Sequence, residues 1–381
     1  MAYSKFQFIA LETPTFDPVT PAQRSDKDTD YVAKWVEVDK SLKLSDDAKA
    51  RLNWIRNAVE EAWASNHVKI DDTDTLKIFA APEFFFRPEV FNNAAALNPS
   101  EEAIKAAKQE KKKLKIPDPE RFYPLDEAES IVKLFGVLFS QETLKDWIII
   151  PGTILGSFEN NSPITKNQAY VIKGGEKDPK KAILTKHTKL NTPGGDGVPE
   201  RSRFTIKPPK GDLTPQKEYE INWMAKVRTN IIDLGGFTLG IDLCMDHGAR
   251  VLYRTCKRWA GKDDKALGVH LQLLVACGHL LKPESIATFK GGILLRVEGA
   301  STQTPYSQAL KVTKTDWDDY ALSDFERHDP DAPYLSPKEV PRRSQPTIKV
   351  KAQKAYNYTE CLRVYTATVI PVKEAEKVQA P

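Results

Sequence analysis

Short apolar runs, each ended by a proline, a glycine or a polar turn, recur along the chain and limit the folds that it can adopt. Residues 76–81, 147–150 and 237–243 are three such runs. Runs of this length are typical of strands buried on both faces, which need no alternating polar residues. Between residues 5–11 and the run at 76–81, residues 45–63 begin with a capping serine and place apolar residues at helical spacing. The order strand, helix, strand predicts an α/β fold.

Further apolar runs extend this pattern over most of the chain. We expect a helix at residues 131–139 and strands at residues 168–172, 182–184, 229–234, 271–276, 292–297 and 361–369. Segments without this pattern separate the runs. The sequence therefore predicts one domain spanning residues 1–381, with surface insertions near residues 98–125, 197–225 and 313–348.

Charge limits the partners that the chain can have. The net charge of +4 is the small difference between 56 basic and 52 acidic side chains, so no overall field favours nucleic acid or an anionic membrane. The basic run at residues 108–115 lacks interleaved aromatic residues, which is typical of solvated surface rather than of an RNA or DNA site. A small-molecule substrate fits this composition at least as well.

Cysteine usage and hydropathy indicate the compartment. No apolar stretch approaches the roughly eighteen residues of a membrane span, and residues 1–14 do not resemble a leader, so we expect a cytoplasmic protein with no membrane partner. Its four cysteines are too few and too scattered for a disulfide framework, and none forms a zinc-binding pair. We therefore expect free thiols, and neither a metal nor an organic cofactor.

Reactive side chains follow three of the expected strands. Glu83 follows Ala-Ala-Pro. Lys186 and Lys189 come shortly after the expected strand at 182–184, and Cys244 directly follows the run 237–243. In layered α/β folds, active sites lie at strand ends of this kind. The three segments are therefore candidates for one active site.

Glu83 and Cys244 each allow a plain structural interpretation beside the functional one. Glu83 precedes three phenylalanines, whose apolar surface would raise the pKa of its carboxyl group, but it could also be a surface residue or pair with Arg87. A lone cysteine in an apolar strand is usually a small core residue. The polar residues within four positions of Cys244, which include Asp242 and Asp246, favour an exposed turn and a reactive thiol instead.

These three motifs resemble those of the nitrilase superfamily, whose catalytic Glu, Lys and Cys occur in this chain order. Ala-Pro-Glu-Phe matches the Pro-Glu signature around Glu83, and Cys-Met-Asp matches a nucleophile followed two positions later by an acid. Lys-His-Thr-Lys-Leu resembles a run in which the second lysine is catalytic, which selects Lys189 over Lys186. The sequence is similar to the family from residue 5 to about residue 369, but the match is sharp only at these motifs.

The resemblance implies a four-layer αββα sandwich whose protomers pair into a homodimer or larger homo-oligomer. It also implies a second acidic residue that positions the others, for which Asp196 and Glu200 are the candidates; Asp196 fits equally well as a turn residue between glycines. Residues next to the motifs are candidates for the substrate pocket. These are Phe84, Met245, Asp246, His247, Cys277 and His279.

The expected reaction is hydrolysis of a non-peptide carbon–nitrogen bond through a thioester on Cys244. Cys-Met-Asp is more similar to the amidase form of the motif than to the Cys-Trp-Glu of true nitrilases, so an amide is the first choice of substrate. A nitrile, or acyl transfer from the same thioester, is the alternative. A catalytically silent scaffold is the alternative from another class.

Overall fold

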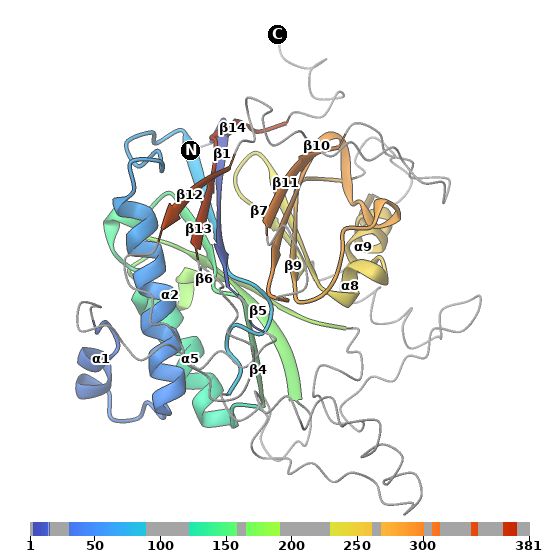
Figure 1. The fold of residues 1–381 in the computed structure, drawn as a ribbon. Helices are drawn as coiled ribbons and strands as arrows, with labels where there is room; N and C mark the ends of the chain where they lie inside the picture. Colours follow the sequence, from blue (N-terminus) through green and yellow to red (C-terminus); the bar gives the residue numbers. More distant parts are fainter. Residues whose placement is uncertain are drawn as a thin grey trace, which may run out of the picture.

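The computed structural model shows two β-sheets with helices on their outer sides (Figure 1). The residues that it describes are 3–13, 15, 30–88, 122–157, 165–190, 229–260, 268–300, 307–312, 337–341 and 361–371. Most of the expected insertions at 98–125 and 197–225 lie outside these ranges. The expected insertion at 313–348 contains one described segment, Pro337–Pro341, which forms the edge strand β12 of the first sheet.

The first sheet has nine strands, in the order β12-β13-β1-β2-β3-β5-β4, with β14 paired to β1 and β6 paired to β5. Strands β1, β2 and β3 are parallel neighbours, and the strands around them are antiparallel. The bounds are β1 (Lys5–Glu12), β2 (Thr75–Ala80), β3 (Trp147–Ile150), β4 (Thr153–Ser157), β5 (Thr165–Lys173), β6 (Ile183–Thr188), β12 (Pro337–Pro341), β13 (Cys361–Tyr365) and β14 (Thr368–Val369).

The second sheet has five strands, in the order β11-β10-β9-β8-β7. Its three central strands are parallel, and its two edge strands are antiparallel to their neighbours. The bounds are β7 (Ile231–Asp233), β8 (Thr238–Leu243), β9 (Val269–Ala276), β10 (Thr288–Glu298) and β11 (Ser307–Lys311). Both sheets thus have parallel strands at their centres, as expected for buried apolar runs.

The described helices are few and mostly short. Two long helices, α2 (Asp46–Ala64) and α5 (Leu125–Leu138), cover the first sheet, and α9 (Val251–Ala260) packs on the second. Ser45 caps α2, because its side chain accepts the Ala48 N–H. The shorter elements are α1 (Ala33–Val38), η3 (Glu142–Leu144), α6 (Pro179–Ala182), α8 (Met245–Gly248) and η6 (Pro283–Ser285). No helix among the described residues has the length and hydropathy to cross a bilayer.

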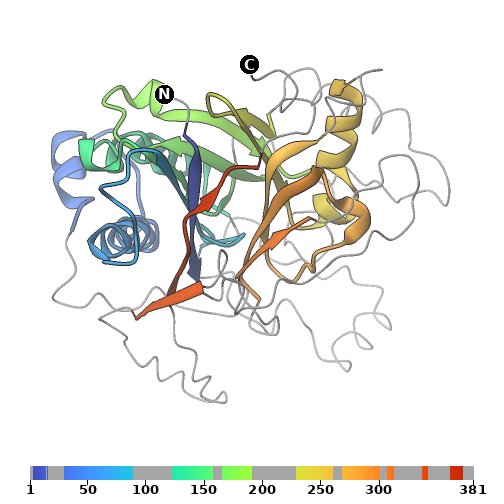
Figure 2. The ribbon, with the colours of Figure 1, turned by 90° about the horizontal axis from the view of Figure 1, so that it is seen from above.

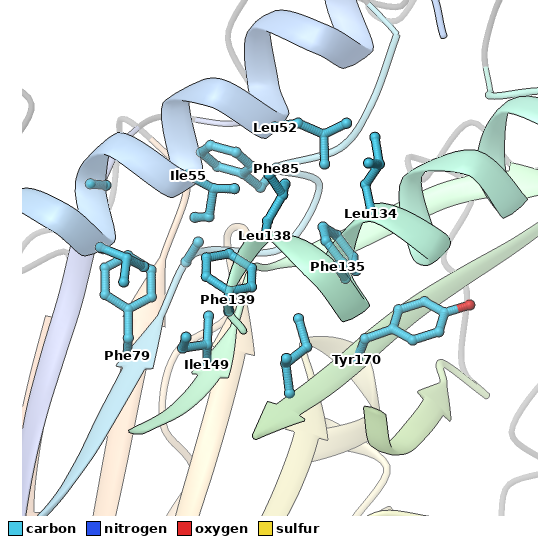
Figure 3. Close-up of a cluster of buried hydrophobic side chains, with 14 of the residues drawn as sticks. Leu52, Ile55, Phe79, Phe85, Leu134, Phe135, Leu138, Phe139, Ile149 and Tyr170 are labelled. Carbon is cyan, nitrogen blue, oxygen red and sulfur yellow. The ribbon is translucent and has the colours of Figure 1, made fainter. Parts of the chain in front are cut away.

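Alternate side chains of the first sheet enter two different cores. In β3, Ile149 packs with α2 and α5, whereas Ile148 and Ile150 pack with the second sheet. The cluster under the helices includes Phe85 and Phe135 (Figure 3). Seen from above, the two sheets face each other (Figure 2), and the core between them joins residues of both, such as Phe8, Ile78, Ile241 and Leu273. Burial on both faces explains why these strands read as continuous apolar runs.

Most expected elements are confirmed, and several bounds differ. The expected hairpins at residues 168–184 and 229–243 exist as antiparallel pairs β5–β6 and β7–β8. The helix expected at residues 131–139 begins earlier, at Leu125, and the strand expected at residues 361–369 is divided into β13 and β14. The mixed α/β fold class is confirmed at the level of two facing sheets with outer helices.

Candidate active site

Glu83 lies in a tightly held segment directly after β2, and its side chain is fully buried. The Phe84 N–H donates to Thr153 Oγ1 at 2.8 Å, and the Phe85 carbonyl accepts from Arg51 Nη1 at 2.8 Å. Gly152 allows this close packing, because a Cβ there would lie 2.4 Å from the Pro82 carbonyl oxygen. Contacts from β4 and α2 therefore fix the carboxylate at the end of a central strand, and the interpretation of Glu83 as a surface residue is wrong.

Glu83 and Lys189 form a buried ion pair. Lys189 Nζ lies 2.7 Å from Glu83 Oε1, and both side chains have 0% exposure. The same carboxylate oxygen accepts from Asn167 Nδ2 at 2.8 Å, and the Asn167 carbonyl accepts the Lys189 N–H at 2.9 Å. A charge-assisted contact of this length fixes both groups relative to each other. Two of the three expected catalytic residues are therefore in direct contact.

Asn167 is a site residue that the sequence analysis missed. It lies in β5, one residue before the apolar run on which the strand was predicted. Its side chain holds the carboxylate and its backbone holds the lysine segment. The buried side chain of this asparagine was not foreseeable from periodicity, since a polar residue at the start of a run reads as part of a turn.

Lys186 lies apart from this pair. Lys186 belongs to β6 and is exposed, whereas Lys189 follows the end of the strand and is buried. The strand's alternation points Lys186 and His187 to opposite faces. Of the two lysines left open by the local sequence, Lys189 is the one beside Glu83.

Phe84 forms one wall beside the ion pair. Lys189 Nζ lies 5.5 Å from the centroid of the Phe84 ring, and Arg87 lies 5.4 Å from it. The backbone of Phe84 has φ 62°, a left-handed conformation that is uncommon for residues other than glycine. Strained residues of this kind persist where the surroundings fix them, and they cluster at functional sites.

Cys244 occupies a second strained position, at the end of β8. Its φ and ψ are 47° and −107°, its N–H donates to the Val275 carbonyl at 3.0 Å, and its carbonyl accepts the His247 N–H at 3.0 Å. The residue is 5% exposed, and its Sγ lies 3.7 Å from the Cys277 carbonyl oxygen. Cys244 is thus a thiol at a sharp strand-to-helix turn rather than a side chain within the strand. Met245, which is half-buried, begins the helical turn α8.

The turn at Cys244 is tied to the segments of both partners. Asp246 is buried and accepts the Leu190 N–H at 3.1 and 3.0 Å through its two oxygens, which links α8 to the residue after Lys189. On the other side, the Thr15 hydroxyl donates to the Glu83 carbonyl and lies 3.7 Å from Cys277 Sγ. Both sheets therefore bring the carboxyl ends of their parallel strands together at this site, where ligands bind in layered α/β folds.

Cys277 differs from Cys244 in its surroundings. Burial, followed by the nearby charges of Glu83 and Glu298, raises the pKa of the Cys277 thiol well above its usual value. A thiol of raised pKa is a poor nucleophile at neutral pH. A role of Cys277 in the substrate pocket stays a prediction. Cys244, Cys256 and Cys277 are all free thiols.

His247 has a structural part in the turn. Its Nδ1 lies 3.1 Å from Asp242 Oδ2, and its Nε2 accepts the Lys282 N–H at 3.0 Å, so both ring nitrogens have partners inside the protein. Gln272 Nε2 donates to the same Asp242 oxygen at 2.9 Å. This buried network joins β8, β9 and the β9–β10 connection behind Cys244.

Three candidates remain, of which the structure describes His279 but not Asp196 or Glu200. His279 is 8% exposed and follows Cys277 by two positions. Asp196 and Glu200 lie outside the described residues, as does the loop expected around them. The second acidic role that the resemblance implied therefore stays a prediction.

Comparisons with known proteins complete the description. The protein-family models gave no match, and the search of curated proteins gave none either. Among solved structures, a carbon-nitrogen hydrolase from Helicobacter pylori G27 is similar over 82% of this chain and 87% of that chain, with 13% sequence identity and a TM-score of 0.39. We therefore base the function of this chain on its own side chains.

Proposed function

We propose that the protein is a carbon–nitrogen hydrolase that cleaves a non-peptide amide through a thioester on Cys244. The observation that carries the proposal is the fully buried Glu83–Lys189 pair, held by Asn167, at the strand ends where the Cys244 turn is anchored. A proton acceptor, a fixed cation and a thiol are the groups that acyl transfer through cysteine requires. The proposal includes the αββα sandwich of the nitrilase superfamily.

In the first half of the proposed reaction, Glu83 takes the proton of the Cys244 thiol as the sulfur attacks the amide carbon. The carbonyl oxygen becomes an oxyanion, which the Lys189 ammonium and the backbone N–H after the cysteine stabilise. The carbon–nitrogen bond then breaks, Glu83 returns its proton to the leaving nitrogen, and an amine or ammonia departs. The acyl group remains on sulfur as a thioester.

In the second half, water releases the acyl group. Glu83 takes one proton from the water as its oxygen attacks the thioester carbon, and the carbon–sulfur bond breaks as the intermediate collapses. The proton on Glu83 passes to the Cys244 sulfur. The sum of the steps is one amide and one water converted to one carboxylic acid and one amine or ammonia.

Ammonia release from a panel of amides, carbamoyl compounds and nitriles tests the proposal. Purified protein is expected to hydrolyse at least one amide, and Cys244→Ala is expected to reduce kcat by about a thousandfold or more, because no acyl intermediate can form. Cys256→Ala is the matched control, since Cys256 belongs to α9 and is buried where this helix packs on the second sheet. Turnover confined to nitriles, or to an added amine acceptor, would replace the amidase by the nitrilase or the acyltransferase.

The result that would overturn the proposal is full activity of Cys244→Ala on a substrate that the parent protein hydrolyses. Circular dichroism and the unfolding midpoint of the variant accompany the assay. They separate the loss of a nucleophile from the loss of the fold.

A further inference from the structure

His279 carries a buried nitrogen that the protein itself leaves without a hydrogen bond. Within the described part of the chain, His279 Nε2 has no hydrogen-bond partner, although the residue is only 8% exposed. The ring packs on Gly248, where an added Cβ would lie 2.9 Å from Cε1 and 3.0 Å from Nε2. A buried polar atom of this kind costs free energy unless a ligand or water supplies the partner.

Lys282 brings an ammonium group to the same place. A Cβ added at Gly248 would lie 3.4 Å from Lys282 Nζ and 3.0 Å from His279 Nε2, so both groups approach the same side of this glycine. Lys282 is half-buried, and it forms no ion pair with a carboxylate of the described residues. Two other cations near His279 each have a carboxylate partner: Lys189 pairs with Glu83, and Arg296 pairs with Glu298 at 2.6 Å.

This pair of groups contacts the helical turn that follows the proposed nucleophile. His279 is two residues after Cys277, whose carbonyl oxygen is 3.7 Å from Cys244 Sγ. Gly248 ends the helical turn α8 that begins directly after Cys244. The charge of Lys189 also reaches His279, where it contributes to the lowered pKa of the imidazole. Through Cys277 and Gly248, both groups are therefore connected to the segments that hold Cys244.

We infer that His279 and Lys282 bind a carboxylate of the substrate, so that the preferred substrates are amides that carry a carboxylate at their far end. The inference rests on the proposed function. A carboxylate has two acceptor oxygens, one for the Nε2–H of a neutral imidazole and one for the ammonium. It satisfies the buried nitrogen and neutralises the local excess of positive charge in one contact.

Matched pairs of amides test the inference. Succinamate and butyramide have chains of similar length, as do glutaramate and valeramide, and each pair differs in the charge of the far end. The parent protein is expected to prefer the carboxylate in each pair by about tenfold or more in kcat/KM, from a charge-assisted contact. Lys282→Met is expected to abolish that preference by raising KM for the amides that carry a carboxylate. Lys290→Met, at an exposed lysine of β10, is the matched control and is expected to keep it.

A binding measurement gives a result that does not depend on turnover. Glutarate is expected to raise the unfolding midpoint of Cys244→Ala, and the rise is expected to vanish when Lys282→Met or His279→Leu is added. His279→Leu is also expected to raise the midpoint of the ligand-free protein, because it replaces the unpartnered nitrogen by hydrocarbon.

Two outcomes overturn the inference: equal kcat/KM for the charged and neutral amides, or no rise in midpoint with glutarate. Either result leaves the thioester mechanism intact if Cys244→Ala is inactive. Full activity of Cys244→Ala would instead remove the proposed function, whether or not glutarate binds.

Discussion

At the scale of single residues, the contact between Glu83 and Lys189 places two charged groups where water does not reach them. Both side chains are fully removed from solvent, and the oxygen that meets the ammonium also meets Asn167. Transfer of two charges from water is offset only when their geometry is good and their other hydrogen bonds are made. A buried ion pair that has this cost of desolvation is expected where the two charges serve a chemical role.

Removing one member of the pair is expected to be more damaging than removing both. Lys189→Met leaves the Glu83 carboxylate buried without its cation and is expected to lower the free energy of unfolding by about 3–5 kcal/mol. Adding Glu83→Gln to this variant is expected to restore most of the loss. Urea unfolding of both single variants and the double variant measures the coupling. Lys186→Met, at the exposed lysine three residues earlier, is expected to change stability by about 0.5 kcal/mol or less. Additive effects of the two substitutions would contradict a direct coupling.

His279 is expected to make stability depend on pH between about 4 and 6.5. Burial, followed by His247, Lys282, Lys189 and Arg296, lowers the pKa of His279 to about 4. Because this pKa is depressed, the unfolded chain binds the proton first as pH falls below 6.5, and the folded state loses stability until pH reaches about 4. Solvent screening reduces the loss below the limit of roughly 1.4 kcal/mol per pH unit, so a total of about 1–2 kcal/mol is expected.

Urea midpoints at pH 7, 6 and 5 measure this dependence. His279→Gln is expected to flatten the slope, because the glutamine side chain does not titrate. An unchanged slope in that variant would show that another group is responsible.

The sequence predicted the candidate catalytic residues and was less informative about the residues that contact them. Glu83, Lys189 and Cys244 stand out because each follows an apolar run, so their strand-end positions could be predicted. Asn167 could not, because its role depends on a contact across 84 residues of sequence. The resemblance selected Lys189 over Lys186, and the structure shows that Lys189 is the lysine in contact with Glu83.

At the scale of elements, the turn between β3 and β4 determines where Glu83 lies. Gly152 has φ 86°, and a Cβ there would lie 2.4 Å from the Pro82 carbonyl oxygen and 2.6 Å from Phe85 Cβ. The segment that carries Glu83 therefore rests directly on this glycine. A side chain at position 152 would push the carboxylate away from Lys189.

Gly152→Ala is expected to reduce both stability and activity. The strained backbone costs about 1–2 kcal/mol, and the clash with Pro82 and Phe85 adds to it. Gly291→Ala is the matched control, because Gly291 has φ 94° but no atom within 4 Å of the added Cβ. Unfolding midpoints and kcat are measured for both. We expect a larger loss of stability in Gly152→Ala and a loss of kcat in that variant alone. Equal effects in the two variants would show that the clash does not displace Glu83.

Elements with strong apolar runs were predicted, and weaker ones were not. Strands β2, β3 and β8 are buried on both faces, so hydrophobicity and the residues that end them sufficed. Strand β11 was not predicted, because it is short and partly polar. It forms by pairing with β10. Helix α5 begins before the expected residue because its first turns are largely polar, and there packing rather than periodicity sets the start.

At the scale of the whole molecule, the two sheets share a core and are also joined by polar contacts of Ser307. The core between them contains residues of both sheets, among them Phe8 and Leu273. Glu12 of β1 accepts from Arg363 Nε of β13 at 2.6 Å and from the Ser307 hydroxyl of β11, which joins the sheets. Shared burial of this kind couples the unfolding of one sheet to that of the other. The sequence predicted one domain, and the pairing of protomers stays a prediction.

The described fold is expected to unfold in one cooperative transition. Calorimetry of the parent protein and of Glu12→Gln measures it. The substitution weakens the contact between the sheets and is expected to lower the midpoint by a few degrees, from about 1–3 kcal/mol, while the transition stays single. Two separate transitions in either protein would show that the sheets belong to independent units.

The measurement that tests the central claim most directly is the mass of the protein during turnover. Protein mixed with a hydrolysed amide, quenched in acid within milliseconds to seconds and digested, is expected to carry the acyl group on the peptide that contains Cys244. The adduct is expected to be absent from Cys244→Ala and to appear more slowly in Lys189→Met. Turnover without an adduct on Cys244, or an adduct on Cys277 instead, would contradict the account.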